Sequence, residues 1–233
     1  MNLSMTKNEI RKFAFQLNGQ YNKDLENLKN LRILYPKDRV GVCRNRFASN
    51  RRMEDGEMSK PHGIIVFGVN GVGKTTLGRE LARILNYKHM DIEAYAFRET
   101  EIPYTDQRSN EECIALMLAD IKKYRSFVIS AVTGDFGDTI PLFYELAILI
   151  SAPVETRIRR IEQRAYERHG ARVREGGDMY EQNLKFIDFA ASRSLAKIEQ
   201  WAGTLTCPVI RIDGTVDWCA NAVNIINQFY NKD

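Results

Sequence analysis

The segment from Gly68 to Thr76, GVNGVGKTT, limits most strongly how this chain can fold. It follows the apolar run Ile64 to Phe67 and precedes a helical pattern of apolar residues. It matches the pattern GxxxxGK followed by Ser or Thr, whose glycines let backbone N–H groups turn toward phosphate oxygens at the start of a helix. A strand, this loop and a helix in that order predict an α/β fold with a site for nucleotide phosphates.

The predicted phosphate-binding residues all lie in this loop: Gly68, Asn70, Gly71, Val72, Gly73, Lys74, Thr75 and Thr76. The Lys74 ammonium group should reach the terminal phosphates, and the Thr75 hydroxyl should ligate Mg²⁺. The loop alone is compatible with a motor, a switch or a kinase.

Strands and helices alternate along the rest of the chain. The predicted strands are 64–67, about 87–91, 126–132, 146–151 and 207–212, and the predicted helices are roughly 75–86, 111–124, 153–169, 180–202 and 216–229. This alternation predicts a doubly wound parallel sheet of five strands with helices on both faces. Residues 58–233 form the predicted domain, and residues 1–57 form a partly helical, partly irregular N-terminal extension.

The composition of the 233-residue chain, 44% hydrophobic and 27% charged, is typical of a globular protein. No apolar run approaches the roughly 18 residues of a membrane span, so no membrane partner is expected. The cysteines lack zinc-site spacing and no secretion signal is evident, which favours a cytoplasmic location. Residues 1–57 carry 12 Lys and Arg against 7 Asp and Glu. Nucleic acid is therefore a candidate partner, but a solvated extension is the favoured interpretation. The oligomeric state stays open.

Sequence signatures of other nucleotide-binding classes are missing. A GTPase would carry DxxG and NKxD segments. A remodelling ATPase would have acidic residues directly after the strand at 126–132, whereas this strand continues into Thr133-Gly134-Asp135. Asp135-Phe136-Gly137 spells the DFG of protein kinases, but the HRD segment that those enzymes need does not occur.

Residues 62–230 resemble the small P-loop kinases, the group of shikimate, gluconate and nucleoside-monophosphate kinases. Four segments carry the resemblance: GVNGVGKTTLGRELARIL, Asp91-Ile92-Glu93, the arginine-rich part that follows AILISAPVETRIRRIEQR, and VIRIDGT at 209–215. The resemblance implies ATP·Mg²⁺ as donor and a small-molecule hydroxyl as acceptor. Such transfer depends on positioning and charge neutralisation more than on covalent chemistry.

Asp91 and Glu93 are the acidic candidates in this scheme. At the carboxyl end of a strand beside the phosphate loop, Asp91 could bind Mg²⁺ or accept the proton of the attacking hydroxyl, and Glu93 could hold the acceptor. The alternative is that both residues cap and charge the first turn of a helix. The resemblance also implies that Thr133, Gly134 and Asp135 contribute to acceptor binding.

Arginines recur after the fourth predicted strand at helical spacing, as Arg157, Arg160, Arg164, Arg168 and Arg172, and predict one basic face. The resemblance implies that Arg164 and Arg168 are catalytic and that Arg164 also contacts the nucleotide. It implies that Arg193, assigned to the acceptor site, reaches back to phosphate, with a surface salt bridge as the alternative. It implies a lid at about 166–179, hinged on Gly176-Gly177. A solvated face paired with glutamates is the alternative.

The sequence therefore predicts an ATP-dependent kinase of a small molecule. Two alternatives remain open. One is an ATP-binding regulatory protein whose basic N-terminal arm binds a partner or nucleic acid, and the other is a toxin-like or nucleic-acid-end kinase. Aromatic residues near the second predicted strand, namely Tyr87, Tyr95, Phe97 and Tyr104, are candidate walls of an acceptor pocket, although core packing is their default role.

Overall fold

A computed structural model describes residues 60–230, and the predicted extension at 1–57 lies outside these residues. The strands are β1 (His62–Phe67), β2 (Lys88–Asp91), β3 (Ser126–Ala131), β4 (Tyr144–Ser151) and β5 (Val209–Asp213). The helices are α3 (Lys74–Leu85), α4 (Ile92–Ala96), α5 (Asn110–Tyr124), α6 (Val154–His169), α7 (Tyr180–Ser192), α8 (Leu195–Ala202) and α9 (Trp218–Tyr230). Two short 3-10 helices are η1 (Ile140–Phe143) and η2 (Gly170–Val173).

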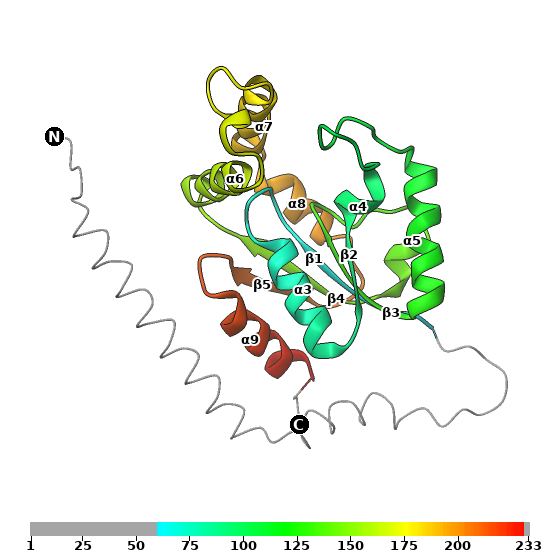
Figure 1. Cartoon of the computed structure of the whole chain (residues 1–233). Helices are drawn as coiled ribbons and strands as arrows, with labels where there is room; N and C mark the ends of the chain where they lie inside the picture. The colour runs from blue at the N-terminus through cyan, green and yellow to red at the C-terminus, as the bar shows by residue number, and fades with distance from the viewer. Residues whose placement is uncertain (1–59, 231–233) are drawn as a thin grey trace. The chain divides into compact units, whose positions relative to one another are not determined.

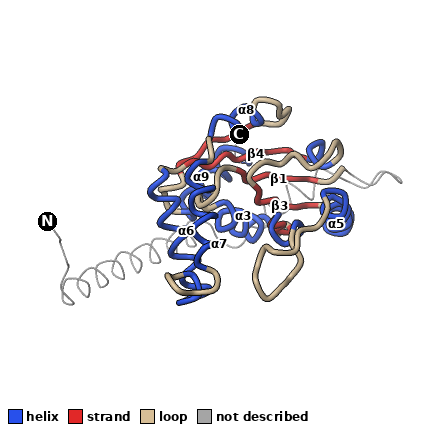
Figure 2. The backbone as a smooth tube through the Cα atoms, turned by 90° about the horizontal axis from the view of Figure 1, so that it is seen from above, coloured by secondary structure: helices blue, strands red, loops and turns tan. Residues whose placement is uncertain are grey.

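The five strands form one parallel sheet in the order β2-β3-β1-β4-β5, with β1 at the centre. Helix α3 packs against α9 on one face of the sheet, and α8 lies on the other face (Figures 1 and 2). The predicted doubly wound fold is thus confirmed. Coverage on both faces explains why β1, β3 and β4 are almost continuously apolar.

The core lies along β1 and the neighbouring strands. The side chains from Ile64 to Phe67 are at most 1% exposed. The Trp201 ring of α8 meets the Phe67 ring edge-on, with 4.9 Å between centroids. Full burial of each such side chain contributes roughly 1.5–3 kcal/mol. The phosphate loop therefore starts from a buried strand at the centre of the sheet.

The prediction of one continuous helix at 180–202 is wrong. The structure has two helices there, α7 and α8, separated by Arg193 and Ser194. Arg193 has extended backbone (φ −65°, ψ 120°), and the Ser194 hydroxyl accepts a hydrogen bond from the Ala196 N–H at 3.1 Å, which caps α8. The apolar spacing continues through the break, so the helical period alone did not reveal it.

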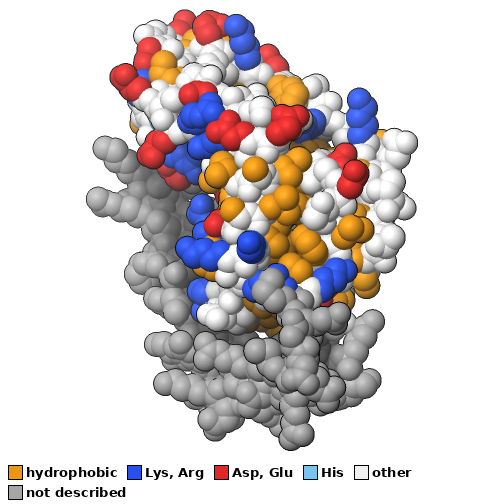
Figure 3. Space-filling model, turned by 90° about the vertical axis from the view of Figure 1, so that its right-hand side faces the viewer, with side chains coloured by type: hydrophobic (Ala, Val, Ile, Leu, Met, Phe, Trp, Pro, Cys, Tyr) orange, Lys and Arg blue, Asp and Glu red, His pale blue; other side chains and the backbone are white. Residues whose placement is uncertain are grey.

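Charged side chains are unevenly distributed over the surface. On the face shown in Figure 3, hydrophobic side chains gather in the middle, Asp and Glu lie mostly toward the top, and Lys and Arg lie both at the top and along the lower edge of the hydrophobic patch. The top of the molecule carries α7 and the segment between α4 and α5 (Figure 1). No helix within residues 60–230 is long and apolar enough to span a bilayer. Cys113, Cys207 and Cys219 are free thiols.

Candidate nucleotide and acceptor site

The phosphate loop joins β1 to α3 and leaves the start of α3 open to an anion. Gly73 caps α3 without a side-chain hydrogen bond, and the first turn contains no acidic residue. The N–H groups of that turn and the positive end of the helix dipole are therefore uncompensated. Gly71 has φ +82°, and a Cβ there would lie 2.6 Å from the carbonyl oxygen of Arg157. Only glycine fits this approach of the loop to α6.

Gly68 has a different role from the one predicted. Its N–H donates to the carbonyl oxygen of Val132 at 3.2 Å, so this amide is not available to a phosphate. A Cβ at Gly68 would lie 2.3 Å from the carbonyl oxygen of Ile150, on β4. Gly68 therefore permits close packing at the end of β1. The other predicted loop residues, 70–76, all line the cavity described next.

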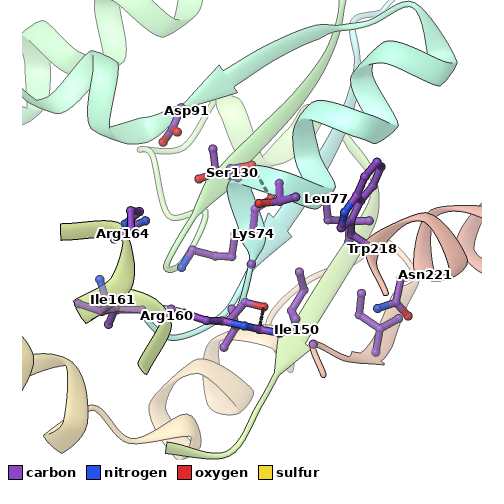
Figure 4. A pocket seen from close by; sticks show the side chains of 18 of the residues that line it. Lys74, Leu77, Asp91, Ser130, Ile150, Arg160, Ile161, Arg164, Trp218 and Asn221 are labelled. Atoms are coloured by element: carbon purple, nitrogen blue, oxygen red, sulfur yellow. Dashed lines mark hydrogen bonds between the residues drawn. The ribbon is translucent and has the colours of Figure 1, made fainter. Parts of the chain in front are cut away.

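A first cavity of about 510 Å³ opens over the loop, within the usual range for small-molecule sites. In Figure 4, Lys74 lies near its centre, with Asp91 and Arg164 toward one end and Trp218 and Asn221 toward the other. The latter two residues belong to α9, directly after the turn that follows β5. Sequence reasoning missed Trp218, which is 41% exposed.

Lys74 is a half-buried cation without a carboxylate partner among the described residues. Its Nζ donates to the carbonyl oxygen of Val69 at 2.9 Å. Burial lowers the pKa of Lys74 to about 8; Arg164 and Arg193 lower it further, while Glu93 acts in the opposite direction. A group of this kind gains most from an incoming anion, because the anion restores the favourable environment that burial removed.

The structure confirms the capping interpretation of Asp91, and its role toward Mg²⁺ or the acceptor stays a prediction. Asp91 caps α4, since its Oδ1 accepts a hydrogen bond from the Glu93 N–H at 3.4 Å. It also lines the first cavity together with Thr75. A carboxylate and a hydroxyl are oxygen donors that suit Mg²⁺, which commonly completes its shell with water and nucleotide phosphates. The described residues contain no cluster of three or more His, Cys, Asp or Glu that could hold a metal ion by itself.

A buried polar network supports the start of α3. The Ser130 hydroxyl donates to the carbonyl oxygen of Lys74 at 3.1 Å and lies 3.0 Å from Nε2 of His89. A carbonyl can only accept, so the single Ser130 proton goes to Lys74 and Nε2 of His89 must donate to Ser130. A Cβ at Gly78 would lie 2.2 Å from the Ser130 oxygen. A serine within the apolar strand FVISA was the available signal for this network.

The arginines of α6 do not form one solvated face. Arg157 is only 3% exposed, and its guanidinium donates to the carbonyl oxygens of Asn70 and Ala190 at 3.3 and 3.0 Å. Arg160 donates to the carbonyl oxygen of Val72 at 3.4 Å. These two arginines brace the phosphate loop from α6. Arg172 lies beyond α6, in η2.

The predicted lid at 166–179 comprises the end of α6, η2 and a compact turn. Arg172 pairs with Asp178 at 2.7 Å, and the Met179 N–H donates to the Arg172 carbonyl oxygen at 2.9 Å. Gly176 has φ +83°, and a Cβ at Gly177 would lie 2.3 Å from the same carbonyl oxygen. The glycines are thus needed for the turn itself. Movement of this segment stays a prediction.

A second cavity of about 450 Å³ adjoins the first. The two share five lining residues: Asn70, Glu93, Val132, Ile161 and Arg164. Aromatic side chains line the second cavity, namely Phe97, Tyr104, Phe186 and Phe189. Arg164, Arg168 and Arg193 are also part of its lining, and Glu93 is its one carboxylate. The cavity is therefore apolar in its walls and positive in net charge.

Two polar atoms that belong to residues of the second cavity lack partners among the described residues. They are Nη1 of Arg193 and Oδ1 of Asn70, both buried. Arg193 lies over the Phe189 ring at 4.8 Å, and burial lowers its pKa. The break between α7 and α8 places Arg193 there. Buried polar atoms without partners are rare in native proteins and suggest a ligand or water at this position.

Thr133, Gly134 and Asp135 line neither of these two cavities. The Gly134 carbonyl oxygen accepts a hydrogen bond from the Tyr144 hydroxyl at 2.9 Å, and a Cβ at Gly134 would crowd Tyr144 and Trp201. This segment is packed against the core, and Asp135 is exposed. The structure thus brings Asp91 and Arg164 to Lys74 but does not bring Asp135 there, so the predicted acceptor role of this segment is not supported.

A family model described as AAA domain matches residues 64–183. The chain belongs to this AAA domain family. With its phosphate loop and parallel sheet, it is a nucleotide-binding P-loop protein. It is 29% identical over 158 residues to the uncharacterized protein YqaC of Bacillus subtilis, covering 64% of this chain and 87% of that protein. It is 33% identical over 79 residues to the pentafunctional AROM polypeptide of Schizosaccharomyces pombe, covering 34% of this chain and 5% of that polypeptide.

Solved structures that match this chain include enzymes and an uncharacterized protein. Shikimate kinase from Acinetobacter baumannii in complex with shikimate matches with a TM-score of 0.44 and 16% identity, over 75% of this chain and 96% of that chain. A gluconokinase from Sinorhizobium meliloti matches with a TM-score of 0.40 and 13% identity, over 76% of this chain and 99% of that chain. An uncharacterized protein from Eubacterium ventriosum matches with a TM-score of 0.42 and 16% identity, over 74% of this chain and 100% of that chain.

Proposed function

We propose that this chain binds ATP·Mg²⁺ in the first cavity and transfers the γ-phosphoryl group to a small anionic acceptor in the second. One observation carries the proposal: the two cavities adjoin beside Lys74 and share Glu93 and Arg164. Phosphoryl transfer requires the acceptor oxygen to approach in line with the terminal phosphate. Adjoining donor and acceptor cavities provide that arrangement.

The donor half uses the open N-terminus of α3, the loop amides of residues 70–76 and the Lys74 ammonium group to hold the phosphates. Thr75 and Asp91 would hold Mg²⁺, whose chemistry in this site is to neutralise charge on the phosphate oxygens. Trp218 and the turn before it would contact the base. Arg164, on the shared wall, would neutralise the transferred group.

The acceptor half is defined by charge and by aromatic walls. Arg168 and Arg193 would bind an anionic group of the acceptor, either a carboxylate or a phosphate. Phe97 and Phe189 would pack against its apolar or ring portion. Glu93 would accept a hydrogen bond from the attacking hydroxyl and orient it toward the γ-phosphate.

A test of the proposal measures ADP release from ATP·Mg²⁺ across a panel of hydroxylated ring carboxylates, sugar acids and nucleoside monophosphates. At least one acceptor should stimulate ADP release. Lys74→Ala should abolish the stimulation, whereas Lys185→Ala, which removes an exposed lysine of α7 outside both cavities, should not. ATP binding without acceptor-dependent ADP release across the panel would contradict transfer and favour the regulatory alternative.

A further inference from the structure

The segment between α4 and α5, residues 97–108, is a closed loop held by its own contacts. Phe97 and Gln107 form an antiparallel bridge. The Arg98 N–H donates to the Asp106 carbonyl oxygen, and the Arg108 N–H donates to the Ala96 carbonyl oxygen, both at 2.8 Å. The base of the loop is therefore closed independently of the residues at its tip.

Tyr104 lies near the tip of this loop and lines the second cavity. Its φ is +67°, which is uncommon for a bulky residue; such backbone strain concentrates at functional sites. Its ring meets Phe97 edge-on, with centroids 5.3 Å apart. Its hydroxyl donates to Oε2 of Glu93 at 2.9 Å and accepts a longer hydrogen bond from Arg168 at 3.5 Å.

The Glu93 carboxylate lies where its position affects both cavities. It lines each of them and is the strongest acidic influence on Lys74. Arg164 lines the same shared wall, so an unrestrained carboxylate would be drawn to these cations. In that position it would compete with a terminal phosphate for Lys74 and repel it.

We propose that Tyr104 is a positioning residue whose hydroxyl holds the Glu93 carboxylate on the acceptor side of the shared wall, away from Lys74. The inference rests on the proposed donor role of the first cavity. Tyr104 lines the second cavity but not the first, so its effect on nucleotide binding passes through Glu93. Tyr104 thus keeps the donor cavity open to a phosphate and the carboxylate available to an acceptor.

The test measures the Kd of the full-length chain for the non-hydrolysable nucleotide AMP-PNP with Mg²⁺ by calorimetry. Tyr104→Phe keeps the ring and the loop contacts but frees Glu93, and should weaken binding about tenfold, the usual scale of a nearby opposite charge. Glu93→Gln should suppress this loss, so that the double variant binds like Glu93→Gln alone. Tyr95→Phe is the matched control, because Tyr95 donates to Asp120 at 2.6 Å and lines neither cavity.

A simple structural role for Tyr104 gives a different result. If Tyr104→Phe loosened the loop, the loss of affinity would persist in the double variant, and that outcome overturns the inference. Wild-type affinity in Tyr104→Phe overturns it as well. Failure of the wild-type chain to bind AMP-PNP would instead contradict the proposed donor cavity, so the two failures are distinguishable.

Discussion

Nucleotide binding should be coupled to proton uptake by Lys74. Burial lowers the pKa of the free Lys74 amine to about 8, so about half of it is neutral at pH 8 and about one tenth at pH 7. Phosphate oxygens beside the amine raise its pKa again and restore the charge. We therefore expect binding to take up about 0.5 proton at pH 8 and about 0.1 proton at pH 7. The affinity should fall roughly tenfold for each pH unit above 8.

The assay is calorimetry of AMP-PNP binding in buffers of different ionisation enthalpy, since the slope of the observed enthalpy against the ionisation enthalpy counts the protons. Lys74→Arg is the control: guanidinium stays charged throughout this range, so this variant keeps any proton exchange of the terminal phosphate and loses the contribution of Lys74. The difference between the two slopes therefore counts the protons taken up by Lys74.

Two results would refute this reasoning. A slope near zero for the wild-type chain at pH 8 would mean that Lys74 is already charged in the free protein. Equal slopes for the wild-type chain and Lys74→Arg would assign the proton to another group.

Three further outcomes follow from the site. Trp218→Ala should weaken nucleotide binding about tenfold if the base stacks on this ring. Because Trp201 is packed against Phe67, quenching of tryptophan fluorescence by ATP should come from Trp218 and should be lost in Trp218→Phe. Unchanged quenching in that variant would place the base elsewhere. Ser130→Ala should lower the free energy of unfolding by about 1–3 kcal/mol in a urea titration, because Nε2 of His89 loses its partner; a stability equal to wild type would contradict the network. Arg157→Met should keep the aliphatic part of the side chain packed but remove its hydrogen bond to the Asn70 carbonyl oxygen in the phosphate loop. The Kd for AMP-PNP should rise several-fold. An unchanged Kd would show that the phosphate loop keeps its shape without this hydrogen bond.

The elements were predictable where their signals are local. The phosphate loop depends on a run of neighbouring residues and a flanking strand and helix, and residues 70–76 line the first cavity as expected. The parallel direction of the strands was predictable from the alternation of apolar strands and helices, because parallel strands need helical crossovers. The apolar period predicted one helix at 180–202, but α7 ends at Ser192 and Ser194 caps the start of α8.

The roles of individual polar residues depended on contacts between distant parts of the chain. Arg157 and Arg164 have the same spacing pattern, yet one braces the loop and the other lines both cavities. Asp91 ends β2 and Asp135 follows β3, yet only Asp91 reaches the first cavity.

The sequence by itself determined the phosphate loop, the parallel sheet and the acidic end of β2, because these depend on local spacing and on the period of apolar residues. Only the tertiary structure decided which arginine is buried, that the Gly68 N–H belongs to the sheet, and that Tyr104 meets Glu93 beside Lys74. Those outcomes depend on which loops the packed helices bring together, and no short stretch of sequence contains that information.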